Sequence, residues 1–199
     1  MTIVGITGGS GAGKSFFCSS LNQSLNSTAS VISLDSYYKG QSLSKIKSEN
    51  LNFDHPDSID YNLLFEHIIK LKNGEKIRKP VYSFHTQNRT KKTITVYPKT
   101  LIFIEGILTL NNEKINDLYD MTIFLDIDKN IRLKRIIERD INERGRSETE
   151  TIKRFNEVVE PMFNKYIYPL KNKVDFILNS SIPNNFIIKL FKTKYLYEN

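Results

Sequence analysis

The sequence predicts an α/β fold with a mostly parallel central sheet and helices on both of its faces. Short apolar runs at 3–7, 100–106 and 121–128 alternate with segments whose apolar residues recur at helical spacing. A glycine-rich loop joins the first apolar run to the first helical segment. The 199 residues contain no internal repeat and no linker, and they are enough for one large core. We therefore expect a single domain over 1–199.

The first half of the chain alternates strands with helices. We predict strands over 3–7 and 31–35, and helices over 14–25 and 61–74. Between the second strand and the second helix lies a polar segment, 36–60. It is too long to be a simple connection, which makes it a functional candidate.

The second half begins with an accessory β-hairpin, whose strands we predict over 79–84 and 92–98. Its remaining elements follow in order. Continuous apolar runs at 100–106 and 121–128 are typical of strands buried on both faces. After them we predict two helices over 129–142 and 147–171, a strand over 174–179 and a basic helical tail.

Composition narrows the class of protein. No apolar run is long enough to span a membrane and the start shows no secretory signal, so we expect no membrane partner. A single cysteine, Cys18, cannot form an internal disulfide, which fits a cytoplasmic location. The net charge of +7 fits a nucleic-acid surface, a site for phosphorylated small molecules or a merely lysine-rich composition. Because the clearest basic cluster, 132–146, is rich in arginine, we favour phosphate handling and expect no nucleic-acid partner.

The loop after the first strand matches the phosphate-binding P-loop. Gly8, Gly13, Lys14 and Ser15 occur at the spacing G-x-x-x-x-G-K-[ST], between a predicted strand and a predicted helix. Glycines let backbone N–H groups curl around an anion, and the helix N-terminus adds its dipole. The sequence thus predicts a P-loop NTPase fold that binds ATP, with Lys14 on the β- and γ-phosphates and Ser15 on Mg²⁺. The predicted donor contacts are Gly8, Gly9, Ser10, Gly11, Ala12, Gly13, Lys14, Ser15 and Phe16.

Two carboxylates are predicted at strand ends near this loop. Asp35 ends the second strand and Glu105 ends a buried strand. The carboxyl ends of neighbouring parallel strands face one crevice. One carboxylate can accept a proton from a hydroxyl, and the other can hold Mg²⁺. The alternative is that Asp35 only starts a turn and Glu105 only caps a strand.

Arginines dominate the segment before and after Gly145. Arg132, Arg135 and Arg139 share one helical stripe, and Arg144 and Arg146 flank the glycine. One interpretation is a solvated face that pairs with Glu138 and Glu143. The one we favour is a helical arginine lid, hinged at the glycine, that closes over ATP and neutralises the transferred phosphoryl group.

These motifs together resemble the uridine kinase (uridine–cytidine kinase) family, within the phosphoribulokinase/uridine kinase group of P-loop kinases. The likeness covers almost the whole chain. It rests on GGSGAGKS, DSYY, NFDHPDSID, PVYSF, IFIEGIL and RLKRIIERDINERGR, followed by VVEPMFNKYIYPLKNKVDFI. It implies transfer of the ATP γ-phosphate to the 5′-hydroxyl of uridine or cytidine, with Mg²⁺, and a homo-oligomer, commonly a tetramer.

The resemblance also implies roles for individual residues. It makes Asp35 the general base, with Lys14 and Arg139 as further catalytic residues. Ser15 and Glu105 would associate with Mg²⁺, and Arg139 would also contact ATP. The implied substrate-binding residues are Asp35, Tyr38, Phe53, Asp54, Tyr82, Phe84, Gln87, Arg144, Arg146 and Arg154.

Three positions depart from the family pattern. Gln87 stands where the family usually has a His at the pyrimidine edge, with His85 two positions earlier. Ile136 replaces one of a pair of arginines, and Arg154 replaces a Gln associated with ribose binding. These departures leave the nucleobase preference open. They keep two alternatives in view: a kinase of the same group acting on another nucleoside or hydroxylated metabolite, or a P-loop ATPase that acts as a regulatory switch.

Overall fold

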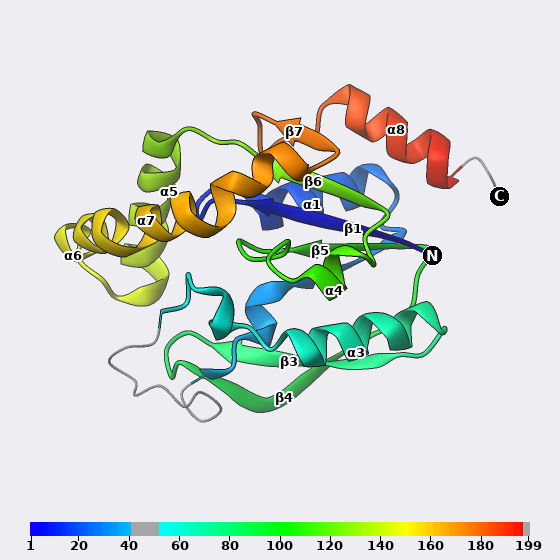
Figure 1. The fold of residues 1–199 in the computed structure, drawn as a ribbon, viewed down its shortest axis with the longest axis horizontal. Helices are drawn as coiled ribbons and strands as arrows, with labels where there is room; N and C mark the ends of the chain where they lie inside the picture. The colour runs from blue at the N-terminus through cyan, green and yellow to red at the C-terminus, as the bar shows by residue number, and fades with distance from the viewer. Residues whose placement is uncertain (41–51, 197–199) are drawn as a thin grey trace.

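The predicted parallel sheet is confirmed in a computed structural model, which describes residues 1–40 and 52–196. Its five strands run in the order β2-β5-β1-β6-β7, and every neighbouring pair is parallel (Figure 1). The strands are β1 (Thr2–Gly8), β2 (Ala29–Ser33), β5 (Leu101–Glu105), β6 (Met121–Leu125) and β7 (Phe176–Leu178). The part of the predicted 36–60 segment that falls on 41–51 lies outside the described residues.

Helices cover both faces of the sheet, as the alternation of apolar runs predicts. On one face, α1 (Lys14–Ser24) and α8 (Asn185–Leu196) pack on β1, β5 and β6. On the other face, α3 (Tyr61–Lys72) and the short α4 (Glu113–Asn116) pack on the same strands together with β2. Helix α4 is not among the elements predicted from the sequence. No helix in the described ranges combines the length and the apolar character needed to cross a membrane.

The second strand begins and ends two residues earlier than predicted. β2 ends at Ser33, and Leu34–Tyr37 form a 3-10 turn, η1, so the expectation that Asp35 ends a strand is wrong. Leu34 is buried to 1% exposure and Tyr37 is fully buried. These two residues are the first and last of the turn, and their burial anchors it to the core. Asp35, between them, lies just beyond the carboxyl end of β2.

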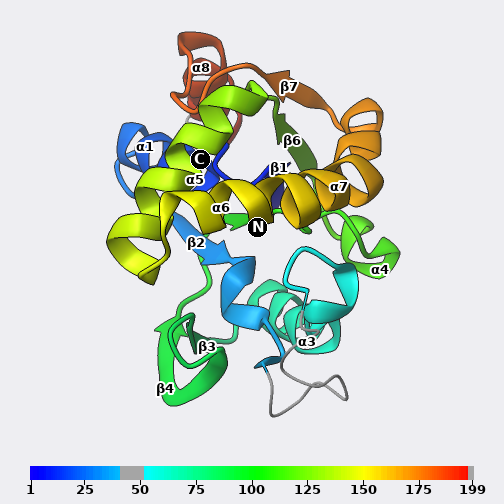
Figure 2. The ribbon, with the colours of Figure 1, turned by 90° about the vertical axis from the view of Figure 1, so that its left-hand side faces the viewer.

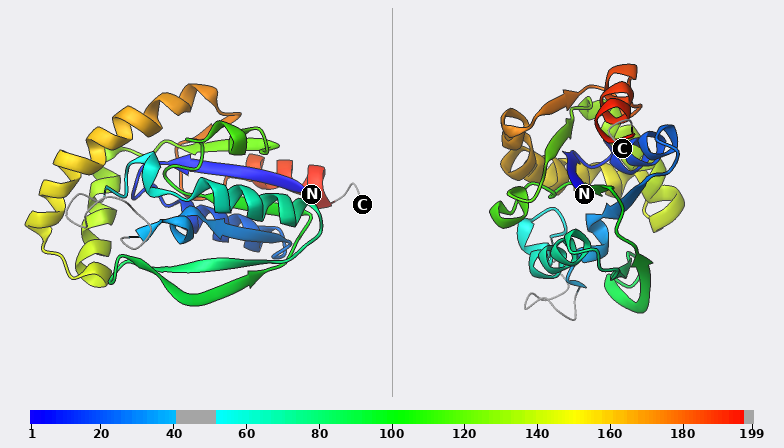
Figure 3. Two further views of the ribbon diagram at one scale, coloured as in Figure 1. Left: turned by 60° about the horizontal axis from the view of Figure 1, so that its bottom comes forward. Right: turned by 90° about the vertical axis from the view of Figure 1, so that its right-hand side faces the viewer.

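The predicted hairpin forms a separate two-stranded antiparallel sheet from β3 (Ile77–Ser83) and β4 (Asn88–Val96). It lies beside α3 (Figures 1 and 3), and its ends, Ile77 and Val96, join the same buried cluster as that helix. The connection is shorter than predicted, because residues 88–91 already belong to β4.

The lid forms at the end of the sheet opposite the N-terminus (Figures 1 and 2). It begins with α5 (Lys129–Arg144), which ends where Gly145 adopts a φ of 64°, the break that the sequence predicted. The returning helix alternates in geometry through α6 (Glu148–Arg154), π-helical η4 (Phe155–Val159), α7 (Glu160–Met162), π-helical η5 (Phe163–Ile167) and 3-10 η6 (Tyr168–Lys173). Pro161 has no N–H to donate, so a regular α-helical ladder cannot run through this point.

Candidate functional site

The P-loop wraps closely against its neighbours. Gly11 (φ 76°) and Gly13 (φ 83°) adopt left-handed conformations at the entry to α1. A Cβ on Gly11 would lie 2.5 Å from the carbonyl oxygen of Arg132 in α5, and one on Gly13 would lie 2.7 Å from Cβ of Ser181. Only glycine therefore allows the loop this close to the lid helix and to the segment after β7.

The lysine of the motif bonds back to the loop, and the serine bonds to the end of β5. Lys14 is 7% exposed, and its Nζ donates to the carbonyl oxygens of Gly8 (3.1 Å) and Gly9 (3.0 Å). Burial lowers the pKa of Lys14, and the negative charge of Glu105 partly offsets this effect. The Ser15 hydroxyl donates to Oε1 of Glu105 at 2.9 Å.

A cavity of about 250 Å³ lies beside this loop. Arg135 and Arg139 close it from the lid, and Asp35 and Glu105 lie at its floor. Of the predicted donor contacts, Gly11, Gly13, Lys14, Ser15 and Phe16 line it, whereas Gly8, Gly9, Ser10 and Ala12 lie in the loop but do not. Two neighbouring oxygen groups, the exposed Ser15 hydroxyl and the buried carboxylate of Glu105, fit the preference of Mg²⁺ for oxygen donors.

Asp35 lies between this cavity and a second one. It lines both the phosphate-loop cavity and a pocket of about 530 Å³ on the side of the hairpin. Burial raises the pKa of Asp35 to about 6, and the nearby Glu105 carboxylate contributes to the rise. A carboxylate with such a pKa is ionised at neutral pH yet accepts a proton readily, as a general base requires.

The second pocket, which we call the acceptor pocket, brings together nine of the ten predicted substrate-binding residues. They are Asp35, Tyr38, Phe53, Asp54, Phe84, Gln87, Arg144, Arg146 and Arg154. Tyr82 does not line the pocket. Its ring instead packs against two residues that do line the pocket: the ring centroid lies 5.3 Å from that of Tyr38 and 5.3 Å from that of Phe84. Its hydroxyl is buried and has no hydrogen-bond partner among the described residues.

One acid of the acceptor pocket is already paired. Asp54 is 5% exposed, and Oδ2 of its carboxylate accepts a hydrogen bond from Nη2 of Arg154 at 2.8 Å. Arg154 is one of the positions that depart from the family pattern. It lies at the last residue of α6 and reaches the loop before α3.

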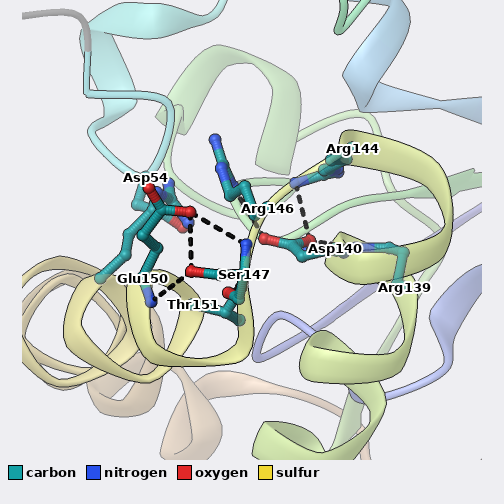
Figure 4. A network of polar contacts seen from close by, with 9 residues as sticks. Asp54, Arg139, Asp140, Arg144, Arg146, Ser147, Glu150 and Thr151 are labelled. Carbon is teal, nitrogen blue, oxygen red and sulfur yellow. Dashed lines mark hydrogen bonds and ion pairs between the residues drawn. The ribbon is translucent and has the colours of Figure 1, made fainter.

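Three lid arginines converge on a carboxylate that is not among the predicted site residues. Asp140 is fully buried, and its oxygens lie 2.8 Å from Arg139, 3.5 Å from Arg144 and 2.7 Å from Arg146 (Figure 4). Burial alone would raise the pKa of Asp140, but these guanidiniums hold it below its usual range. Arg144 also lies over the ring of Phe84, 4.5 Å from its centroid.

The remaining lid arginines are not a solvated face. Arg132 is 2% exposed and donates to Glu160 at 2.8 Å, and Arg135 donates to the carbonyl oxygens of Gly11 and Ala12. Within the described part of the chain, the ion pairs found for the arginines of residues 132–146 run to Glu160 and Asp140, not to Glu138 or Glu143.

Three pocket residues were missing from the predicted set: His85, Glu143 and Gly145. Each lies next to a predicted residue in sequence. The stronger omission is Asp140, whose only signal in the sequence is an acid that follows Arg139 among the arginines of the lid helix.

Comparisons with known proteins agree on the fold. Residues 3–187 match the profile of the family described as Phosphoribulokinase / Uridine kinase. The uridine kinase of Klebsiella pneumoniae is 41% identical over 198 residues, which cover 96% of this chain and 93% of that protein. The uridine kinase of Bacillus velezensis is 40% identical over 194 residues, with coverages of 96% and 92%.

Two solved structures extend this likeness. A possible uridine kinase from Bacillus stearothermophilus has a TM-score of 0.61 at 19% identity, covering 89% of this chain and 88% of that one. Phosphoribulokinase from Rhodobacter spheroides also has a TM-score of 0.61, at 18% identity, with coverages of 87% and 68%. The predicted P-loop kinase fold is confirmed.

Proposed function

The chain belongs to the phosphoribulokinase / uridine kinase family, and we propose that it is a nucleoside kinase that transfers the γ-phosphate of ATP to the 5′-hydroxyl of uridine or cytidine. One observation carries this proposal: Asp35 borders both the phosphate-loop cavity and the acceptor pocket. A hydroxyl presented from the pocket therefore meets a base at the point where the outermost phosphate would lie.

The chemistry follows from the residues around that point. Asp35 takes the proton of the hydroxyl, whose oxygen attacks the γ-phosphorus while the bond to the β-phosphate oxygen of the donor breaks. Lys14 and Arg139 stabilise the negative charge on the transferred group. Ser15 and Glu105 would hold Mg²⁺, which supplies positive charge to the donor phosphates.

The charges of the acceptor pocket favour a neutral acceptor. Three arginines and three acids line it: Arg144, Arg146, Arg154, Asp35, Asp54 and Glu143. Two of these arginines are also paired with Asp140. The pocket thus offers no excess of positive charge for an acceptor that already carries a phosphate. A nucleoside fits better, since Asp54 can accept hydrogen bonds from ribose hydroxyls and the aromatic wall can contact a base.

A third cavity could hold the base of the donor nucleotide. It measures about 670 Å³ and shares Arg135 with the phosphate-loop cavity. Ile131, Asn179 and Ile182 supply apolar and amide groups to it. The three cavities thus follow one another as acceptor, phosphates and donor base, with Asp35 and Arg135 at the two junctions.

The direct test is a panel of acceptors incubated with ATP and Mg²⁺, scored by ADP release. We expect turnover with uridine or cytidine, and none above background with pantothenate or ribulose 5-phosphate. ADP release that does not depend on any acceptor would favour the alternative of a P-loop ATPase switch. Turnover with another nucleoside or a different hydroxylated metabolite would keep the kinase and correct its substrate.

The resemblance to uridine kinases supports two further proposals: that the protein works in pyrimidine salvage in the cytoplasm, and that it assembles as a homotetramer. Light scattering on the purified chain measures its mass directly. A mass equal to that of one 23.1 kDa chain would contradict the tetramer.

A further inference from the structure

Arg89 of β4 contacts the turn that carries Asp35. Its Nε donates to the carbonyl oxygen of Tyr38 and its Nη2 to that of Tyr37, each at 2.9 Å. Its Nη1 donates to Oδ2 of Asp60 at 3.1 Å. One guanidinium thus uses all three of its nitrogens.

The partners of Arg89 belong to the other two segments of the acceptor site. Tyr37 and Tyr38 follow Asp35 within four residues, and Tyr38 lines the acceptor pocket. Asp60 is the N-cap of α3, where its Oδ1 accepts from the backbone N–H of Leu63, and its own N–H donates to the carbonyl oxygen of Tyr37. Arg89 therefore joins the hairpin, the η1 turn and the start of α3.

The geometry requires an arginine. A four-residue 3-10 turn leaves carbonyls at its end without partners inside the turn. The planar guanidinium presents five N–H donors in a fixed fork, so it can satisfy two carbonyls and a carboxylate together, whereas a lysine ammonium cannot match this arrangement. The Arg89 side chain is 16% exposed, so most of this contact is shielded from water.

We propose that Arg89 is a positioning residue for the phosphoryl transfer. This role rests on the proposed function: Arg89 fixes the η1 turn so that Asp35 faces the phosphate-loop cavity while Tyr38 closes the acceptor pocket. The hairpin makes a second contact with the η1 turn, in which Nζ of Lys79 donates to Oγ of Ser36 at 2.9 Å. Because a displacement of about 1 Å can cost about 100-fold in rate, a loosened turn impairs transfer even when both cavities persist.

Three variants test this role. Arg89→Met keeps the length of the side chain and removes the donors, Arg89→Lys keeps the charge without the fork, and Arg78→Met on the paired strand β3 removes an exposed arginine as the matched control. We expect Arg89→Met to lower kcat about 10- to 100-fold and to raise KM for the nucleoside, with KM for ATP changed less than about two-fold. The kcat of Arg89→Lys should lie between those of Arg89→Met and the wild type, and the kcat of Arg78→Met should match that of the wild type.

Hydrogen–deuterium exchange supplies a readout that does not depend on turnover. In Arg89→Met, we expect faster exchange at the amides of Lys39 and Asp60, which bond across this junction, and unchanged exchange in α1 and β1. If the wild type phosphorylates no nucleoside, the proposed function fails, and exchange still decides whether Arg89 holds the turn.

Unchanged kcat together with unchanged exchange would overturn the inference. So would a uniform loss, in which exchange rises throughout the molecule and both KM values shift alike, because Arg89 would then serve general stability. If Arg89→Met does not fold, the same two measurements on Arg89→Lys decide the question.

Discussion

Arg154 lies 2.8 Å from Asp54 and occupies Oδ2 of the carboxylate that we propose binds the ribose hydroxyls. The pair places a cation where the family pattern has a neutral amide. The ribose hydroxyls and Arg154 would therefore share one carboxylate.

We expect Arg154→Gln to strengthen binding of ribonucleosides. Release of Oδ2 allows a second hydroxyl to bond, and one such hydrogen bond contributes about 1 kcal/mol, or about five-fold in KM. KM for uridine should fall by about that factor, while KM for 2′,3′-dideoxyuridine should not change. Lys153→Gln, at the exposed neighbouring position, is the control. An equal shift for both nucleosides would show that Arg154 does not act through the ribose hydroxyls.

Asp35→Asn should remove the general base while donor binding persists. We expect kcat to fall by about 10²- to 10⁴-fold, with the ATP affinity measured by calorimetry unchanged. In the wild type, kcat should decline as the pH falls through about 6, because the carboxylate must be ionised to accept the proton. A variant that retains wild-type turnover would remove Asp35 from the role of base.

The same substitution should stabilise the folded protein at alkaline pH. Burial raises the pKa of Asp35 to about 6, above the value near 3.9 expected for an unfolded chain. The unfolded state therefore ionises first, and folding loses stability as the pH rises from about 4 to about 6, after which the loss is constant. Asp35→Asn should recover on the order of 2–3 kcal/mol at pH 8 and less at pH 5, measured by denaturant unfolding. A benefit that is larger at pH 5 would contradict this sign.

Asp140→Asn should affect the lid and the stability together. The variant leaves Arg139, Arg144 and Arg146 without their shared carboxylate, and breaking such a buried cluster costs about 3 kcal/mol of the free energy of unfolding. We also expect kcat to fall at least about ten-fold, since the arginines lose their fixed positions. Asp117→Asn, on an exposed carboxylate, is the control. Wild-type stability in Asp140→Asn would show that the arginines find other partners.

The sequence was sufficient for those parts of the site that depend on local spacing. The P-loop, Glu105 at the end of β5 and the break at Gly145 are where the motifs predicted them. The apolar Leu34 favoured a strand over residues 31–35, but Leu34 is buried as the first residue of the η1 turn instead. Likewise, residues 88–91 read as a loop because they are polar, although both faces of an accessory hairpin can accept polar side chains.

The omissions concern which charged side chains meet in the folded chain. Arg89 acts through partners 29 to 52 positions away, which spacing cannot identify. Asp140 pairs with arginines one, four and six positions away, but an acid among arginines on a helix can equally face solvent. The pairing of Arg154 with Asp54 spans 100 positions. Periodicity reports which face of an element is buried, but not which charges that burial brings together.

The position of Arg144 has a consequence for how the two substrates influence each other. Its guanidinium lies 3.5 Å from Asp140 in the lid and 4.5 Å from the centroid of the Phe84 ring, which lines the acceptor pocket. If nucleoside binding fixes this side chain and thereby changes the affinity for ATP, then ATP binding must change the affinity for the nucleoside by the same factor, because binding linkage is reciprocal. Cooperativity between ATP and nucleoside is thus expected from one shared cation, and truncating Phe84 should weaken it without removing either ligand.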